Sequence, residues 1–401
     1  MRIRSDSLTC ARYSATSRTD NRRSDGMFRS LSIRGYRGFS HFDVEGLGCV
    51  NLLVGRNNSG KTSVLEALYL LAAGGEPSAL WTVLTRRGEQ MERVRAPRDE
   101  VELDVSHLFH GHELRPNVSA EFSTKNSEPE RRLEYSIRES TADDKPTPAS
   151  EARRSPLEPP TTRLVMAING TPKPVVNAIP LTRRGAMSSD VLEAPSRPRR
   201  TRNERPKPAE YISTESLSAD QLASSWNEIA LTDSEERVLN ALRFIEPKVE
   251  RIAPIVPTGY YYPYIMPMPR GGFKVKLKGS SVPIPIGSLG DGLWRMLAMA
   301  ISLIRSKEGI LLVDEIDTGL HYTVMSDMWK LIYASAREFN IQVFATTHSY
   351  DCIHSLATIC DADVETNSKV TIQRIESDRK EAVRYTEAEI KEAAKRQIEV
   401  R

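Results

Sequence analysis

The octapeptide GRNNSGKT at 55–62 constrains the fold more than any other feature, because it fits the pattern G-x-x-x-x-G-K-[ST]. It follows the apolar run VNLLV at 50–54 and precedes SVLEALYLLAA at 63–73, whose apolar residues recur at helical spacing. A buried strand, a glycine-rich loop and a helix are therefore predicted in succession, which is the context that this pattern requires. The sequence thus favours an α/β fold.

The loop composition predicts a phosphate site. Two glycines allow the backbone to curl so that its N–H groups face a phosphate, and the start of the helix adds a partial positive charge. Lys61 is predicted to reach the β and γ phosphates, and the hydroxyl of Thr62 to ligate Mg²⁺. The expected cofactors are ATP and Mg²⁺. The predicted ATP-binding residues are Gly55, Arg56, Asn57, Asn58, Ser59, Gly60, Lys61, Thr62 and Ser63.

Two later segments supply groups that the loop lacks. The apolar run ILLVDE at 310–315 ends in adjacent carboxylates. Asp314 is expected to hold the magnesium through water, and Glu315 to orient and deprotonate the attacking water. His348, in FATTHS, ends the next predicted strand and is expected to sense the γ-phosphate, a structural histidine being the alternative. Lys61, Glu315 and His348 are thus the predicted catalytic residues.

Five segments together resemble the RecF/SMC/OLD branch of ABC-type ATPases, which implies a P-loop ATPase head. The resemblance covers about 27–85 and 215–401, at both ends of the chain. The segments are IRGYRGFSHFDV (33–44), VGRNNSGKTSVLEALYLL (54–71), GDGLWRMLA (290–298), LLVDEIDTGLH (311–321) and FATTHS (344–349).

The resemblance implies a homodimer in which two heads enclose two ATP molecules. The glycine-rich turn before 293 would be the signature segment that reaches the γ-phosphate of the other subunit, and Asp317 to His321 the D-loop at the dimer seam. The chain departs from the family pattern at two positions, since Gly290 stands where the phosphate-binding serine belongs and His321 replaces an acidic residue. The predicted signature residues are Ser288, Gly290, Asp291 and Gly292.

The resemblance also leaves three functions to weigh. OLD-type nucleases append a Toprim domain, for which the short stretch after TIQRI at 371–375 leaves no room. The first expectation is therefore an ATPase that regulates a separate effector, a nuclease or a toxin, in DNA repair or phage defence. The second is a RecF-like repair ATPase that binds DNA directly. The third is a nucleotide-dependent scaffold with little hydrolysis, because the signature serine is missing.

The expected fold class is α/β, an ABC-type P-loop head with a mixed central sheet flanked by helices. A single head is predicted over 27–401, with an irregular, antiparallel and loop-rich insertion at about 90–213. Pro, Ser and Arg predict mobile loops at 138–163 and 185–210. The polar stretch 1–26 is predicted to be a disordered extension, with a transit peptide as the alternative. Three smaller expectations are a capping box from Thr232 to Glu235, a hairpin turn at Gly279 and Ser280, and a Q-loop within 104–113 that is not assigned to a residue.

Charge and composition exclude few functions. Lys and Arg number 56 against 53 Asp and Glu, which argues against a nucleic-acid coat over the whole surface. Arg34 and Arg37 are open as nucleotide or DNA contacts or as plain exposed arginines of a strand. The basic stretch 196–208 is open as a DNA contact or as a solvated linker. The 4 cysteines have no ligand spacing, and the spacing of His107, His110 and His112 disfavours a metal. No apolar run is long enough to cross a membrane, so no membrane contact and a cytoplasmic location are expected.

Overall fold

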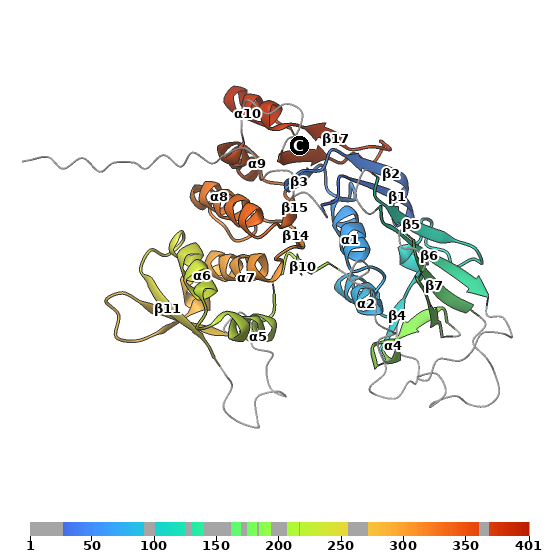
Figure 1. The fold of residues 1–401 in the computed structure, drawn as a ribbon, viewed down its shortest axis with the longest axis horizontal. Helices are drawn as coiled ribbons and strands as arrows, with labels where there is room; N and C mark the ends of the chain where they lie inside the picture. Colours follow the sequence, from blue (N-terminus) through green and yellow to red (C-terminus); the bar gives the residue numbers. More distant parts are fainter. Residues whose placement is uncertain are drawn as a thin grey trace, which may run out of the picture.

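The computed structural model describes residues 27–91, 101–125, 130–139, 162–169, 175–182, 184–193, 207–215, 217–255, 272–360 and 369–400. These residues form two six-stranded sheets, with helices between the sheets and on the outer face of one of them (Figure 1).

The central sheet is mixed, as predicted. Five of its strands run parallel, and β17 pairs antiparallel with β16 at one edge. The strands β3, β14 and β15 are buried along their whole length, which explains why they read as continuous apolar runs and not as alternating patterns. The sheet order is β10 (Ala209–Ile212), β14 (Ile310–Val313), β15 (Gln342–Thr346), β3 (Val50–Val54), β16 (Val370–Arg374) and β17 (Val383–Tyr385).

The second sheet is antiparallel throughout. Helices α1 (Lys61–Ala72) and α2 (Pro77–Arg86) lie between it and the central sheet, so α1 is buried on nearly all sides (Figure 1). The order is β2 (Phe39–Glu45), β1 (Ser30–Tyr36), β5 (Ser119–Ser123), β6 (Arg132–Glu139), β7 (Thr162–Asn169) and β8 (Val175–Pro180).

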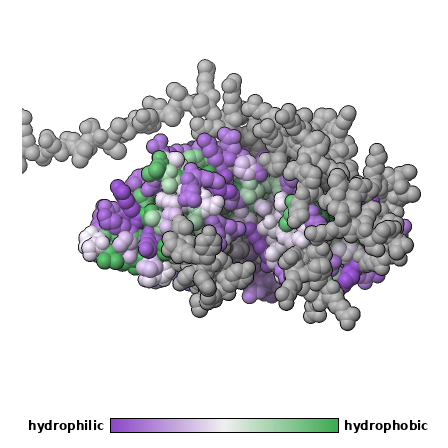
Figure 2. All heavy atoms as spheres, turned by 90° about the horizontal axis from the view of Figure 1, so that it is seen from below, coloured by the Kyte–Doolittle hydropathy of each residue, from purple (hydrophilic) through white to green (hydrophobic). Residues whose placement is uncertain are grey.

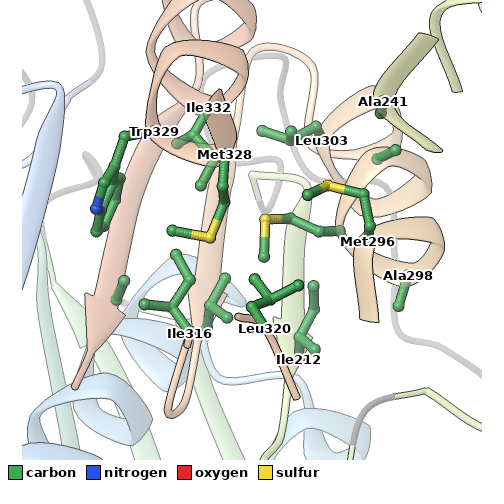
Figure 3. Packing of buried hydrophobic residues seen from close by; sticks show 14 of the residues in the cluster. Ile212, Ala241, Met296, Ala298, Leu303, Ile316, Leu320, Met328, Trp329 and Ile332 are labelled. Carbon is green, nitrogen blue, oxygen red and sulfur yellow. The ribbon is translucent and has the colours of Figure 1, made fainter. Parts of the chain in front are cut away.

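Helices cover the opposite face of the central sheet (Figure 1). Figure 3 shows Met296 of α7, Met328 and Trp329 of α8, and Ile316 and Leu320 pointing into one apolar cluster. This cluster supports the chain segment that follows β14. Helices α7 (Asp291–Arg305) and α8 (Tyr322–Glu338) lie against the central sheet, α5 (Ala219–Ile229) and α6 (Asp233–Arg243) pack against α7, and α9 (Tyr350–Leu356) packs against α8.

A small three-stranded sheet delivers the chain to α7. Strand β12 (Phe273–Leu277) pairs antiparallel with β11 (Val249–Pro254) and with β13 (Ile284–Pro285), which confirms the predicted hairpin. The 3₁₀ turn η4 (Ile286–Leu289) follows and ends at Gly290, directly before α7.

The predicted extent of the insertion is wrong at its end. Strand β10 falls within the predicted insertion, and its first two residues within the predicted loop 185–210, yet it is the edge strand of the central sheet and pairs with β14. The predicted loop 185–210 also contains β9 (Ala186–Ser188), which pairs with β4 (Glu102–Asp104), and α4 (Asp190–Glu193). These elements are too short for periodicity to detect beside proline and arginine. Residues 140–161, 194–206 and the extension 1–26 lie outside the described residues.

The predicted capping box at α6 is wrong, because neither of its two reciprocal hydrogen bonds joins Thr232 and Glu235. Thr232 accepts a hydrogen bond from the backbone of Ser234, but the carboxylate of Glu235 accepts from Leu231 N, at 2.7 Å. Leu231 has a φ of 64°, and the resulting turn leads into the N-cap of α6. Reciprocal capping boxes instead begin α5, at Ser218 and Gln221, and α10 (Glu387–Arg396), at Thr386 and Glu389.

Among the described residues, no helix has both the length and the apolar character that crossing a membrane requires. On the face shown in Figure 2, hydrophilic and hydrophobic residues are interspersed over the described surface.

Candidate nucleotide-binding site

Strand register brings the predicted site residues to one edge of the central sheet. Val313 of β14 aligns with Ala345 of β15, and Thr346 aligns with Leu53 of β3. Because these three strands are parallel, their carboxyl ends meet, and the segments that follow them lie side by side. The loop 55–62, the acidic pair 314–315 and the histidine at 348 therefore converge.

Two glycines of the loop are required by its geometry. Gly55 has a φ of 141°, and a Cβ atom there would lie 2.3 Å from the carbonyl oxygen of Ile375. Gly60 has a φ of 100° and begins α1, and a Cβ there would lie 2.2 Å from the ring of Phe39. A larger residue at either position would change the curl of the loop.

Lys61 reaches back over the loop. Its Nζ atom donates to the carbonyl oxygens of Gly55, at 3.0 Å, and Arg56, at 2.8 Å. Burial lowers the pKa of this ammonium, while the charges of Asp314 and Glu315 act in the opposite direction. The ammonium of Lys61 therefore lies beside the loop, where it would attract the phosphate groups of a nucleotide bound there.

The other loop residues divide into two groups. Arg56, Asn57 and Asn58 are exposed. Ser59 is buried, and its hydroxyl has no hydrogen-bond partner among the described residues. Ser63 is also buried, and its hydroxyl accepts from Nη2 of Arg87 at 3.5 Å. Its hydroxyl, a predicted ATP contact, is therefore directed at an arginine of the same chain.

The side chains of Thr62 and Asp314, both predicted magnesium ligands, lie close together. The hydroxyl of Thr62 is 3.2 Å from Oδ2 of Asp314. The hydroxyl of Thr346 donates to Oδ1 of the same carboxylate at 2.6 Å. Thr346 was not among the predicted site residues, although it stands two residues before His348 in the segment FATTHS.

Glu315 occupies a backbone conformation that is uncommon for a side chain of its kind, with a φ of 47°. Both of its backbone polar groups are paired: its N–H donates to Thr346 Oγ1 at 2.8 Å, and its carbonyl accepts from Arg295 Nη2 and from the N–H of Thr318, both at 3.0 Å. Oε2 of Glu315 also accepts from the hydroxyl of Thr318, at 3.3 Å. The acidic turn is therefore held on both sides.

Arg295 is the second site residue that the sequence analysis missed. It lies in α7 with 3% of its surface exposed and donates to the carbonyl oxygens of Ser213, Asp314 and Glu315, at 2.5, 2.6 and 3.0 Å. Burial lowers its pKa to about 10, against the attraction of nearby carboxylates, so the guanidinium is charged at neutral pH. The signal available in the sequence was an arginine flanked by apolar residues in LWRMLAMAISLI at 293–304.

His348 lies within the electrostatic reach of the site. Burial and the positive charge of Lys61 lower its pKa below the usual 6.5, while Glu315, Asp317 and Asp314 act in the opposite direction. The preceding residue, Thr347, donates to Oδ1 of Asp317 at 2.5 Å. The lowered pKa favours the neutral imidazole of His348 at pH 7.

The glycine-rich turn before α7 packs against the predicted D-loop of the same chain. A Cβ on Gly292 would lie 2.8 Å from the carbonyl oxygen of Gly319. Gly290 has φ 94° and ψ 160°, a region that glycine alone adopts readily, and its Cβ position is open. Ser288, Gly290 and Asp291 are exposed, as is His321, whose ring lies 4.4 Å from that of Tyr322.

Arg37 is occupied in a buried ion-pair network. Its guanidinium lies 2.8 Å from Oε2 of Glu66 and 2.5 Å from Oε1 of Glu89, and Tyr36 also donates to Glu66. The open alternative of nucleotide or DNA contact through Arg37 is thereby disfavoured, whereas Arg34 is exposed on β1.

The described residues contain no group of three or more His, Cys, Asp or Glu side chains that could hold a metal. His107 and His112 lie 3.3 Å apart through their Nδ1 atoms, and His110 contacts the carbonyl oxygen of Arg37. The segment 104–113 forms a 3₁₀ turn and a bridge to β1, and the Q-loop stays unassigned.

A glycine-rich loop that leads into a buried helix, with its threonine beside a strand-end aspartate, defines the class of P-loop nucleoside triphosphatases. Residues 50–351, most of the chain, match a protein family described as "AAA domain, putative AbiEii toxin, Type IV TA system". The chain belongs to this family. Short stretches of similarity to RecF proteins support the resemblance to the RecF/SMC branch of ABC-type ATPases that the sequence predicts.

Shorter stretches are similar to characterised proteins. An ATP/GTP phosphatase of Helicobacter pylori is 30% identical over 86 residues, 21% of this chain and 23% of that protein. The DNA replication and repair protein RecF of Nitrosococcus oceani is 50% identical over 44 residues, 11% of this chain and 12% of RecF. The matches therefore span about a quarter or less of these relatives. Among solved structures, an SMC head bound to the C-winged helix domain of ScpA has a TM-score of 0.44 and 14% identity, over 90% of this chain and 98% of that one.

Proposed function

We propose that the site binds ATP with Mg²⁺ and hydrolyses it to ADP and phosphate. The observation that carries this proposal is the meeting of Lys61, Thr62, Asp314, Glu315 and His348 at the carboxyl ends of three adjacent parallel strands. In this assignment the loop 55–63 cradles the phosphates through its N–H groups, and Lys61 leaves the loop carbonyls to pair with the β and γ phosphates.

The donor set fits Mg²⁺. The hydroxyl of Thr62 and the carboxylate of Asp314 are hard oxygen donors within 3.2 Å of each other, and this ion favours a few such ligands together with water and phosphate oxygens. When bound, Mg²⁺ would neutralise charge on the transferred phosphoryl group. Thr346 keeps one oxygen of Asp314 in a hydrogen bond and so fixes the direction of the other.

Glu315 is the proposed general base. Its carboxylate follows the magnesium ligand directly, so that it could accept the proton of a water aligned with the γ-phosphate. Neutral His348 would donate one hydrogen bond to the γ-phosphate, which requires no proton uptake. The bond to the leaving ADP oxygen breaks as the water oxygen bonds to phosphorus, and the water proton passes to Glu315.

The second part of the proposal is a homodimer with ATP at its interface. The exposed turn at Ser288, Gly290 and Asp291 is the surface proposed to reach the γ-phosphate of the other copy, with Asp317 to His321 at the seam. A serine at position 290 would be strained, because the backbone there has a φ of 94°. The glycine therefore matches the backbone conformation of this turn. Backbone N–H groups at the start of α7, with Ser288, would then supply the contacts.

The scaffold alternative has one specific observation in its favour, the same absence of a serine at position 290. A scaffold would bind ATP and dimerise but release phosphate very slowly. Steady-state phosphate release distinguishes the two proposals. An ATPase is expected to have a kcat on the order of 1 to 10³ per second, whereas a scaffold shows no measurable turnover.

We further propose that the ATPase regulates a separate effector, a nuclease or a toxin. The family description, with its mention of a toxin and a type IV system, supports a defence or toxin role, and the RecF matches support a role in DNA repair. OLD-like membership, phage defence and a cytoplasmic location stay predictions from the sequence. Phosphate release measured with and without duplex DNA, at two salt concentrations, tests the repair alternative, because direct DNA binding would give salt-sensitive stimulation.

A further inference from the structure

Arg295 is placed where it joins two parts of the proposed ATPase site. It lies on α7, one helical turn after Asp291 and Gly292, and so belongs to the helix that begins at the glycine-rich turn. Its two Nη atoms donate to carbonyl oxygens after β10 and after β14. No carboxylate receives these hydrogen bonds, although Asp314, Glu315 and Asp317 attract the guanidinium through space.

Two of the three carbonyl oxygens that Arg295 contacts belong to the acidic residues themselves. The Asp314 carbonyl lies 2.6 Å from Nη2, and the Glu315 carbonyl 3.0 Å from the same atom. The backbone at Glu315 has a φ of 47°, which is uncommon outside glycine and persists when surrounding contacts define it. Arg295 supplies one such contact through the carbonyl of Glu315, and Thr346 supplies another through the N–H of Glu315.

Apolar packing fixes the position from which Arg295 acts. Met296 of α7 points into the same cluster as Ile316 and Leu320, which follow the acidic pair (Figure 3). The N-terminus of α7 also touches this segment, since Gly292 approaches the carbonyl oxygen of Gly319. A shift of α7 would therefore move the acidic turn in two ways. It would act through the hydrogen bonds of the Arg295 guanidinium and through the packing of Met296 against Ile316 and Leu320.

We propose that Arg295 is a positioning residue that sets the backbone of the Asp314–Glu315 turn and couples it to the glycine-rich turn at the start of α7. This inference rests on the proposed ATPase function, because it assigns the coupling to the general base. In the dimer, the glycine-rich turn of one copy would contact the ATP of the other copy. This contact would then change the position of Glu315 in the first copy. The two nucleotide sites of the dimer would thus be coupled through Arg295 of each subunit.

The test compares three variants of the full chain. Arg295→Met keeps the length of the side chain and removes its donors, and Arg295→Lys restores charge and part of the hydrogen bonding. Arg305→Met is the matched control, since Arg305 lies on the same helix but pairs with Glu210 and Glu228, away from the acidic turn. Each variant is measured for steady-state phosphate release and for amide hydrogen exchange without nucleotide.

We expect Arg295→Met to lower kcat by about 10- to 100-fold with KM for ATP changed by less than about 3-fold, because misplacing a catalytic group impairs chemistry more than binding. Arg295→Lys should recover part of kcat. Exchange at Glu315 and Ile316 should become faster in Arg295→Met and stay unchanged in Arg305→Met. If Arg295→Met does not fold, Arg295→Lys carries the same comparison with a smaller loss.

Wild-type kcat together with wild-type exchange at 314–316 in the Arg295 variants would overturn the proposal. Equal losses in Arg305→Met would do so too, because the effect would then belong to the helix in general. Failure of the parent function gives a different result: a wild-type protein that does not turn over ATP. In that case the exchange measurement still decides whether Arg295 sets the acidic turn.

Discussion

The hydroxyl of Thr346 donates to Oδ1 of Asp314 at 2.6 Å and accepts the N–H of Glu315 at 2.8 Å, so one side chain orients both acidic residues. The strand register explains this, because Thr346 ends β15 one position beyond the pairing of Val313 with Ala345. A threonine before the histidine at 348 therefore has a defined structural task.

Replacing Thr346 with valine should lower kcat by about 10- to 150-fold and raise the Mg²⁺ concentration needed for half-maximal activity, since hydrogen bonds to charged groups contribute about 1.5 to 3 kcal/mol. Thr346→Ser keeps the hydroxyl and serves as the control. Phosphate release over a Mg²⁺ titration measures both. Equal behaviour of the valine and serine variants would show that the hydroxyl does not orient Asp314.

Lys61→Ala should abolish tight binding of ATP with Mg²⁺, because an ammonium and its phosphate hydrogen bonds vanish from a preorganised site. The side chain contacts only loop carbonyls in the described hydrogen bonds, so its removal should leave the melting temperature nearly unchanged. Isothermal calorimetry tests the affinity. Undiminished nucleotide affinity would contradict the assignment of 55–62 as a phosphate loop.

The pKa of His348 should respond to charge changes in the site in a defined direction. Lys61 lowers this pKa and Glu315 raises it, so Lys61→Met should raise it and Glu315→Gln should lower it further. In the wild type, the neutral imidazole favours folding above the unfolded-state pKa, and this contribution is lost as pH falls through the lower folded-state pKa. NMR titration of the His348 ring without Mg²⁺ provides the measurement, and a shift of opposite sign in either variant would refute the placement of these groups.

The buried network around Glu66 should be essential for stability. The side chains of Glu66 and Arg37 are 5% and 10% exposed, and Arg87 pairs with the same carboxylate at 2.6 Å. Glu66→Gln leaves two arginines facing a neutral amide, so the free energy of unfolding should fall by about 3 to 5 kcal/mol. Urea denaturation measures it, with the exposed pair partner Glu338→Gln as the control, where about 0 to 1 kcal/mol is expected.

Trapped ATP should hold two copies together. In Glu315→Gln the base is absent while ATP still binds, so adding ATP with Mg²⁺ should convert monomer or weak dimer to stable dimer in light scattering. Gly292 is unsuited to blocking this interface, since a larger residue would collide with Gly319 of its own chain. Adding the exposed Ser288→Trp should cancel the shift, and Val282→Trp, 67% exposed in the neighbouring hairpin turn, is the control. An unchanged mass in Glu315→Gln with ATP would refute the nucleotide-bridged dimer.

The sequence predicted those parts of the site that depend on local patterns. The loop 55–62 and the pair Asp314 and Glu315 are contiguous in sequence, and the rule that parallel strands align their carboxyl ends brings them together with His348. Strand β3 was predicted because the apolar run at 50–54 directly precedes the glycine-rich loop.

Other parts depend on contacts that leave no pattern in the sequence. Arg295 binds backbone carbonyls, and any residue supplies a carbonyl, so no partner residue marks the interaction. Strand β10 has four residues between proline-rich and polar segments, and only its pairing with β14 makes it part of the central sheet. The approach of Gly292 to Gly319 likewise arises from how α7 crosses the segment after β14.

The most direct test of the account identifies the nucleotide that stays bound to Glu315→Gln. The protein is incubated with ATP and Mg²⁺, separated quickly from free nucleotide, and the bound nucleotide is resolved as ATP or ADP beside a wild-type sample treated identically. If Glu315 removes the water proton at this site, hydrolysis slows by about 10²- to 10⁴-fold and the variant retains ATP while the wild type holds ADP. ADP formed by Glu315→Gln at the wild-type rate would contradict the assignment of Glu315 as the base.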